Sequence, residues 1–149
     1  MSGSATPVRP MESRDAGSVA RLSGELGYPA AESDVRERLA RLSARPAEAL
    51  FVAESPPGEV VGWIHISEDA TLTDGSTAEV RGLVVDARAR GKKIGSLLLE
   101  RAEGWAAARG YRRVRVRSRT WREDAHRFYR NNGYDLEKTQ HVLGKPLAR

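Results

Sequence analysis

The chain has 149 residues, of which 40% are hydrophobic and 30% charged, and its formal net charge is +5. This balance is typical of one globular domain with a real core, and no apolar run is long enough to span a bilayer. Because the chain has no cysteine, disulfides, thiolate metal sites and a cysteine acyl-enzyme are excluded. No signal pattern opens the sequence, so we expect a cytoplasmic protein with a disordered tail over residues 1–6 and one domain over 7–149.

The first half of the chain contains alternating helical and strand periods separated by turn residues. Ser13 or Asp15 is suited to cap a helix that Gly27 ends. The predicted elements of this half are a strand over 8–11, that capped helix, a second helix over 34–43, and a hairpin of strands over 49–53 and 60–66.

The second half begins with an acidic, polar stretch over residues 68–77 that we expect to be a loop. The remaining predicted elements are a central strand over 78–85, a helix over 91–109, a strand over 111–117, a short helix over 123–131 and a final strand over 139–143. Short hairpins followed by strand–helix–strand units indicate an α/β fold, in which one mixed sheet carries helices on both faces.

The stretch from Glu79 to Leu99 joins a strand, a basic turn and a helix start. A helix start presents free backbone N–H groups and the positive end of its dipole, and glycine lets an anion come close to the backbone. The pattern therefore predicts a phosphate site on the turn, with an ordinary helix start among solvated cations as the alternative. The turn lacks both the P-loop pattern and the GxGxxG dinucleotide pattern.

Two motifs resemble those of the GNAT superfamily of acyl-CoA-dependent N-acyltransferases. Arg88-Ala89-Arg90-Gly91-Lys92-Lys93 is similar to its motif A, Gln/Arg-x-x-Gly-x-Gly/Ala, except that Lys93 stands where Gly or Ala is usual. The segment from Ala125 to Tyr134 is similar to motif B, Ala-x-x-Phe/Leu-Tyr-x-x-x-Gly-Phe/Tyr. The predicted order of elements also matches the family's order, and the resemblance covers residues 7–146.

The resemblance implies an acetyltransferase that uses acetyl-CoA and no metal. The central strand and the strand after the motif A helix are splayed in this family, and the cofactor enters the gap between them. Carried over to this chain, the backbone near the end of the central strand binds the pantetheine arm and polarises the thioester oxygen, while the turn binds the pyrophosphate. The implied cofactor residues are Leu83, Val84, Val85, Arg90, Gly91, Lys92, Lys93, Ile94, Gly95 and Ser96.

The resemblance also implies two catalytic residues. Tyr129 corresponds to the family's tyrosine that protonates the departing thiolate, and a tyrosine packed in the core is the alternative. Glu79 is the predicted general base for the acceptor amine, with Asp86 and Glu123 as runners-up. The alternative for Glu79 is a strand residue paired with an arginine. Histidine is a poor candidate for the base, because His65, His126 and His141 are scattered and none has a partner nearby in the sequence. For His65 a contact with the acceptor stays open, with half-buried packing as the more common alternative.

The acceptor is a primary amine that the sequence does not identify: aminoglycosides, polyamines, amino acids and protein amines all stay open. Arginines alternate along the strand over 111–117. Four interpretations of this arginine face stay open: a rim that binds an acidic acceptor, a dimer contact, a nucleic-acid-binding stripe, or a solvated strand face. A homodimer is compatible with the chain and a membrane partner is not expected. The alternative function is a CoA sensor without catalysis or a basic nucleic-acid binder, although an aromatic content of 6% gives little support to nucleic-acid stacking.

Overall fold

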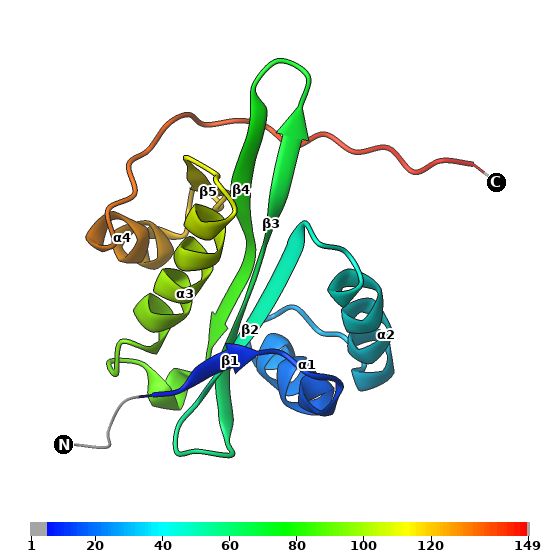
Figure 1. Cartoon of the computed structure of the whole chain (residues 1–149), viewed down its shortest axis with the longest axis vertical. Coiled ribbons are helices and arrows are strands. Elements are labelled where there is room, and N and C mark those ends of the chain that lie inside the picture. Colours follow the sequence, from blue (N-terminus) through cyan, green and yellow to red (C-terminus); the bar gives the residue numbers. More distant parts are fainter. Residues whose placement is uncertain (1–5, 149) are drawn as a thin grey trace. The chain divides into compact units, whose positions relative to one another are not determined.

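The computed structural model describes residues 6–148, and the chain forms two compact units, Met1–Arg117 and Ser118–Arg149 (Figure 1). The expected tail over residues 1–6 lies outside the described residues except for Thr6. The first unit holds a sheet and three α-helices, and the second holds one α-helix followed by the C-terminal segment. Within the described residues no helix is both long and apolar enough to cross a membrane.

One five-stranded sheet organises the first unit, with the strands side by side in chain order. The first four strands pair antiparallel and the fifth pairs parallel to the fourth, which confirms the predicted mixed α/β sheet. The strands are β1 (Val8–Pro10), β2 (Glu48–Glu54), β3 (Val60–Thr71), β4 (Gly75–Val85) and β5 (Val114–Val116).

Helices cover both faces of this sheet, as predicted (Figure 1). A 3-10 turn, η1 (Ser13–Asp15), leads into α1 (Ala16–Glu25), and α1 with α2 (Glu32–Ser43) covers one face. The buried side chains on this face are Met11, Val19, Leu22, Leu39, Val52, Val60 and Val84. The opposite face packs against α3 (Ile94–Ala108), where Leu98 lies over Gly62 so closely that a Cβ at this glycine would come 3.0 Å from Leu98 Cδ1.

The sheet separates between its last two strands. The pairing of β4 with β5 covers only Ala78 to Val80, while β4 itself continues to Val85. Its register with β3 also shifts, because Ile66 pairs with Val80 and His65 pairs with Gly82, so that Arg81 is an extra residue in β4. The predicted splay of the central strand pair is therefore present.

The polar stretch over 68–77 is not the loop that its composition predicted. It extends the hairpin, because β3 and β4 pair as far as Thr71 opposite Gly75. The turn at the tip is held by a hydrogen bond from the Asp74 N–H to Thr71 Oγ1 at 2.9 Å. Backbone pairing forms this ribbon without an apolar face, and composition gives no signal for such pairing.

Three other boundaries differ from the prediction. The strand predicted over 111–117 is shorter, and the helix predicted from Gly91 begins at Ile94. The final strand predicted over 139–143 is wrong, since residues 134–148 form neither helix nor strand. A strand needs a neighbour for its backbone hydrogen bonds, and the described part of the second unit contains no strand that could pair with this segment. By contrast, α4 (Glu123–Asn131) has the predicted bounds.

Lys93 explains why the helix starts late. It is the N-cap of α3 and has left-handed dihedrals of φ 61° and ψ 22°, and no other described non-glycine residue has a positive φ. The family's usual glycine suits this conformation, which a side chain disfavours because Cβ approaches the following carbonyl oxygen.

We expect Lys93→Gly to raise the free energy of unfolding by about 1 kcal/mol, because glycine removes the left-handed strain at this position. Lys92→Gly is the matched control and is expected to lower the free energy of unfolding, since Lys92 has no such conformation. Urea unfolding of both variants measures the effect. Equal losses of stability at both positions would contradict the explanation.

Candidate active site

The motif A turn exposes a row of free backbone amides. After β4 the chain forms a 3-10 turn, η2 (Ala87–Ala89), and then passes through Gly91, with φ 87°, to the cap at Lys93. Among the described residues, the N–H groups of residues 91–96 have no protein acceptor, and no side chain caps α3. Successive amides around left-handed residues at a helix start form a concave anion site. The predicted phosphate cradle is thus free of protein caps.

The side chains around this turn suit an anion. Arg90, Lys92 and Lys93 are exposed, and a Cβ added at Gly91 would meet nothing within 4 Å. The approach to the amides is therefore open and lined with positive charge, which fits the pyrophosphate of a CoA molecule.

Asp86 fixes the turn to the sheet. Its N–H donates to the Val61 carbonyl at 2.7 Å, and its buried carboxylate accepts from the Arg88 N–H at 2.9 Å and from Arg88 Nη2 at 3.0 Å. The side-chain and backbone hydrogen bonds from Arg88 lower the pKa of Asp86 to about 2. Asp86 was a runner-up for the general base, but this geometry makes it the anchor of the turn that is predicted to bind phosphate.

The lowered pKa predicts how Asp86 contributes to stability. A carboxylate whose pKa falls from 3.8 to about 2 on folding stabilises the protein above the higher value, and loses this contribution as the pH falls through the lower one. We therefore expect Asp86→Asn to destabilise the protein at neutral pH and to differ less from the wild type in acid. Unfolding curves across this range measure the difference. If Arg88→Gln lost stability in acid in the same way as the wild type, Arg88 would not be the cause of the lowered pKa of Asp86.

The end of β4 has the form expected for the pantetheine site. Val84 is buried in the core beneath α1 and α2, while Leu83 and Val85 are half-buried. Because β5 pairs with β4 no further than Val80, the backbone of residues 81–85 faces no strand on that side within the described part of the chain. The side chains at this end of β4 therefore pack against the protein, while one edge of the β4 backbone stays available for hydrogen bonds.

Glu79 is enclosed by arginines. Only 4% of its surface is exposed, and Arg117 Nη1 lies 2.6 Å from both carboxylate oxygens. Arg81 Nη1 donates to Glu79 Oε2 at 3.3 Å, and Arg81 Nε donates to Ser67 Oγ at 2.6 Å. The carboxylate thus holds two guanidinium groups on the sheet face that α1 and α2 partly cover.

A second polar pair lies on the same sheet face and has no signal in the sequence. Glu48 Oε1 on β2 lies 2.6 Å from His65 Nε2 on β3, and both side chains are half-buried. The two residues are 17 positions apart, so only the pairing of the two strands brings them together. Next to His65, the Trp63 indole lies against Gly82, where a Cβ would come 2.7 Å from Trp63 Cη2.

Tyr129 lies on α4 in the second unit, in an aromatic cluster. The Phe128 and Tyr134 rings pack edge-on against its ring, with centroids 5.1 and 5.6 Å away. Burial raises the pKa of Tyr129 to about 12, so its hydroxyl keeps its proton at neutral pH. Glu123, the other runner-up for the base, lies in the first turn of this helix and is exposed.

The profile of the acetyltransferase (GNAT) family matches residues 19–134 of the chain. The chain belongs to the GNAT acetyltransferase family. It is 33% identical over 110 residues to aminoglycoside N(6')-acetyltransferase type 1 of Klebsiella aerogenes, a match that covers 69% of this chain and 72% of the relative. It is also 41% identical over 78 residues to the aminoalkylphosphonate N-acetyltransferase of Salmonella typhimurium, which covers 52% of this chain and 51% of that protein.

A solved structure shows the same fold. The structure of AAC(6')-Iy in complex with the bisubstrate analog CoA-S-monomethyl-acetylneamine has a TM-score of 0.85 to this chain. The match covers 97% of this chain and all of that one (100%), at 14% sequence identity. Family and relatives agree that this chain is an acetyltransferase, as the sequence predicted.

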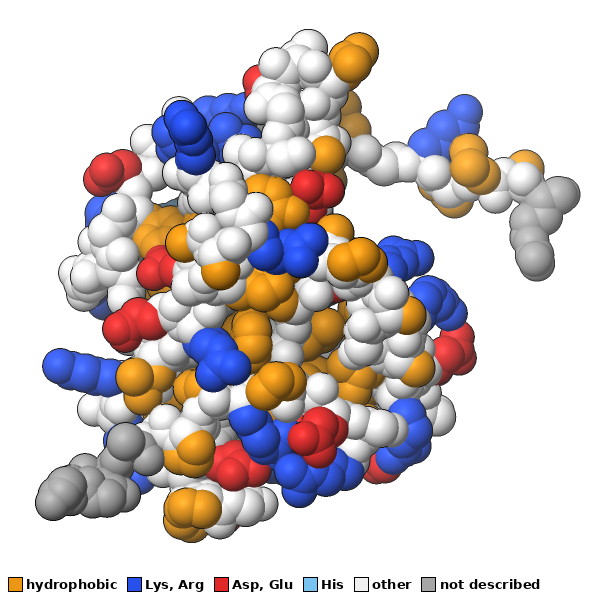
Figure 2. Space-filling model, viewed as in Figure 1, with side chains coloured by type: hydrophobic (Ala, Val, Ile, Leu, Met, Phe, Trp, Pro, Cys, Tyr) orange, Lys and Arg blue, Asp and Glu red, His pale blue; other side chains and the backbone are white. Residues whose placement is uncertain are grey.

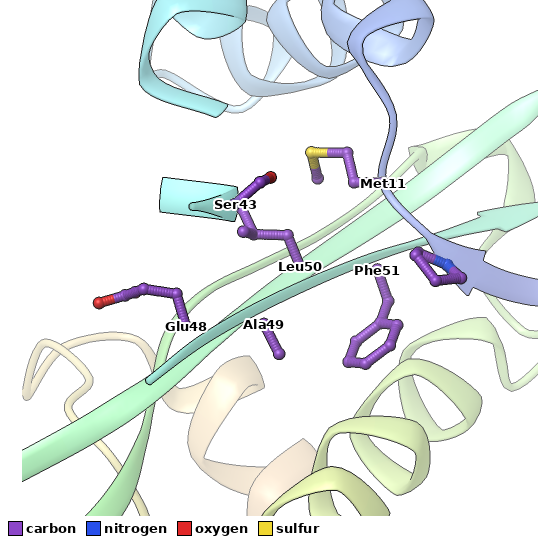
Figure 3. A pocket seen from close by; sticks show the side chains of 7 residues that line it. Met11, Ser43, Glu48, Ala49, Leu50 and Phe51 are labelled. Atoms are coloured by element: carbon purple, nitrogen blue, oxygen red, sulfur yellow. The ribbon is translucent and has the colours of Figure 1, made fainter. Parts of the chain in front are cut away.

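A separate cavity of about 290 Å³ lies beside the first residues of β2, where this strand extends beyond its pairing with β1, and none of the motif A residues lines it. Leu50, Ser43 and Met11 lie on one side of the strand, and Ala49 and Phe51 lie on the other (Figure 3). Its one ionisable group is Glu48, which links the cavity to His65. The cavity is therefore distinct from the turn that is predicted to bind the cofactor.

The arginines do not form a continuous basic stripe on the face in Figure 2, where basic and acidic side chains are interspersed. Of the arginines that alternate on β5 and just beyond it, Arg117 covers Glu79.

Proposed function

We propose that this acetyltransferase moves the acetyl group of acetyl-CoA to a small primary amine that also carries an acidic group, by direct attack in a ternary complex. The observation that carries the cofactor assignment is the row of uncapped amides over residues 91–96. In the proposal these amides bind the pyrophosphate, helped by the charges of Arg90, Lys92 and Lys93. The free backbone edge at Leu83, Val84 and Val85 binds the pantetheine arm as an added strand would.

Acetyl-CoA supplies an activated acetyl group. The amine nitrogen forms a bond to the acetyl carbon, the carbon–sulfur bond breaks, the nitrogen loses a proton and the sulfur gains one. A backbone N–H near Val85 stabilises the charge that develops on the acetyl oxygen. In this scheme the phenol of Tyr129 donates the proton to the thiolate, and its raised pKa keeps that proton available.

Replacing Tyr129 by phenylalanine should lower kcat about 100-fold, because the thiolate loses its proton donor. The KM for acetyl-CoA should change little, since the hydroxyl has no part in cofactor binding. Tyr111→Phe is the matched control: its hydroxyl donates to Glu68 at 2.9 Å, away from the proposed chemistry, and kcat should be retained. Steady-state thiol release measures both, and full activity of the Tyr129 variant would refute the assignment.

Glu79 was predicted as the general base. In the structure both of its oxygens already accept hydrogen bonds from guanidinium groups, which supports the alternative of a strand residue paired with arginine. We therefore assign Glu79 to positioning Arg117 and Arg81. This assignment leaves the acceptor amine in need of another proton acceptor.

Arg117 is the basis for proposing an acidic group on the acceptor. Its side chain is 54% exposed although Nη1 is fixed on Glu79. Its Nε and Nη2 groups have no acceptor in the part of the chain that the structure describes. An anchored guanidinium with free donors is suited to a carboxylate or phosphonate. One of the relatives is named for an aminoalkylphosphonate, which has this combination of groups.

An acceptor panel tests the proposal. We expect an aminoalkylphosphonate to give a kcat/KM about 10-fold or more above that of the alkylamine without the phosphonate, because a hydrogen bond to a charged group contributes about 1.5–3 kcal/mol. In Arg117→Gln this preference should disappear, while the exposed control Arg112→Gln should keep it. A preference for aminoglycosides that Arg117→Gln leaves unchanged would refute the acidic acceptor. Failure to bind CoA at all would refute the cofactor assignment.

A further inference from the structure

We infer that His65, oriented by Glu48, accepts the proton from the acceptor amine. This inference rests on the proposed acetyl transfer and supplies the proton acceptor that Glu79 is poorly placed to provide. It is carried by the hydrogen bond between the two side chains, by the free second nitrogen of the imidazole, and by the place of His65 in the sheet.

The hydrogen bond determines which nitrogen can take a proton. An ionised carboxylate only accepts, so at 2.6 Å His65 Nε2 carries the hydrogen and donates it to Glu48 Oε1. In the neutral ring Nδ1 then holds the lone pair. Among the residues that the structure describes, Nδ1 has no hydrogen-bond partner. Glu48 therefore presents His65 as a base with its lone pair available.

His65 lies beside the splayed part of the sheet. Its Cα pairs with that of Gly82 on β4, two residues beyond the last residue of β4 that pairs with β5. Directly paired residues of antiparallel strands are about 4.5–5.5 Å apart. The imidazole thus stands one strand away from the backbone edge assigned to the cofactor. With 18% of its side chain exposed, it is accessible to a small amine.

The charged groups that share this face divide into two kinds. Glu48 on β2 is paired with His65, whereas Glu79 and Arg81 on β4 bind each other, and Arg117 binds Glu79 from beyond β5. Ser67, between them on β3, accepts from Arg81. Glu48 has the imidazole as its partner, whereas Glu79 has guanidinium groups. Half-buried Asp69 on β3, and Arg115, which pairs with Glu79, lie on this face too. The face therefore offers the imidazole of His65 as a base beside the guanidinium groups held by Glu79.

The acceptor ammonium gives one proton to His65 Nδ1, and the imidazolium is stabilised by the Glu48 carboxylate. The neutral amine then attacks the acetyl carbon, and a second nitrogen proton replaces the one that Tyr129 gives to the thiolate. His65 returns its proton to water, so the enzyme is unchanged after each turnover.

The first test is chemical rescue. In His65→Ala we expect kcat/KM to fall about 100-fold or more, as is typical for loss of a general base. Added imidazole should restore at least a tenth of the lost rate. Glu79→Ala is the matched control, and imidazole should not rescue it. Loss of activity without rescue in His65→Ala, or equal rescue in both variants, would overturn the proposal.

The second test does not depend on turnover. Nitrogen-15 NMR of the histidine rings should show His65 with its hydrogen on Nε2 in the wild type, and a mixture of tautomers in Glu48→Leu. Calorimetry with a CoA-loaded His65→Gln variant should show the acceptor amine bound within about threefold of the wild-type Kd. A ring hydrogen on Nδ1 in the wild type would refute the assigned base.

These measurements separate this inference from the proposed function. If the wild-type protein releases no thiol with any amine, the proposed acetyl transfer fails. If the wild type is active and His65→Gln keeps its full rate with correctly folded protein, only the role of His65 fails.

Discussion

The proposed active site depends on the point where β4 no longer has a paired neighbour. Beyond Val80 the strand continues to Val85, but β5 no longer pairs with it within the described residues. An unpaired strand edge inside a sheet leaves backbone donors and acceptors that need partners. The turn that follows adds uncapped amides, held in place by Asp86 through Val61 and Arg88. Unsatisfied backbone groups therefore lie along one edge of residues 81–85 and at the N–H groups of residues 91–96. A ligand with amide groups and phosphates complements these two stretches.

The sequence predicted the elements that depend on local signals. The bounds of α4 are as predicted, because Asn132 and Gly133 end the helix and Gly133 has a positive φ. The strands rich in apolar residues and the order of the elements could be predicted equally well, and with the two motifs they led to the cofactor turn that we propose. Family membership then confirms the function class, whereas the roles of Tyr129 and Glu79 stay predictions.

Features that arise from pairing between distant segments could not be predicted. The ribbon over residues 68–77 forms through backbone hydrogen bonds between polar strands, and the strand predicted over 139–143 has apolar residues but no neighbour in its unit. Glu48 and His65 meet only because β2 and β3 pair in one register. A shift of one residue would turn one of them to the other face of the sheet. No motif encodes such a pair, since its spacing in the sequence depends on the hairpin and not on the chemistry.

In the function we propose, the distribution of charge across the sheet gives the acceptor an orientation. A carboxylate–imidazole pair lies on β2 and β3, and a guanidinium anchored by a buried carboxylate lies toward β5. An amine with an acidic group can satisfy both only in one direction, with its nitrogen toward His65 and its acid toward Arg117. Burying Glu79 against two arginines is costly unless the geometry is held by further hydrogen bonds, and Ser67 supplies one of them. The extra residue Arg81 in β4 is thus more than an irregularity, because it completes the network that holds Arg117 in position.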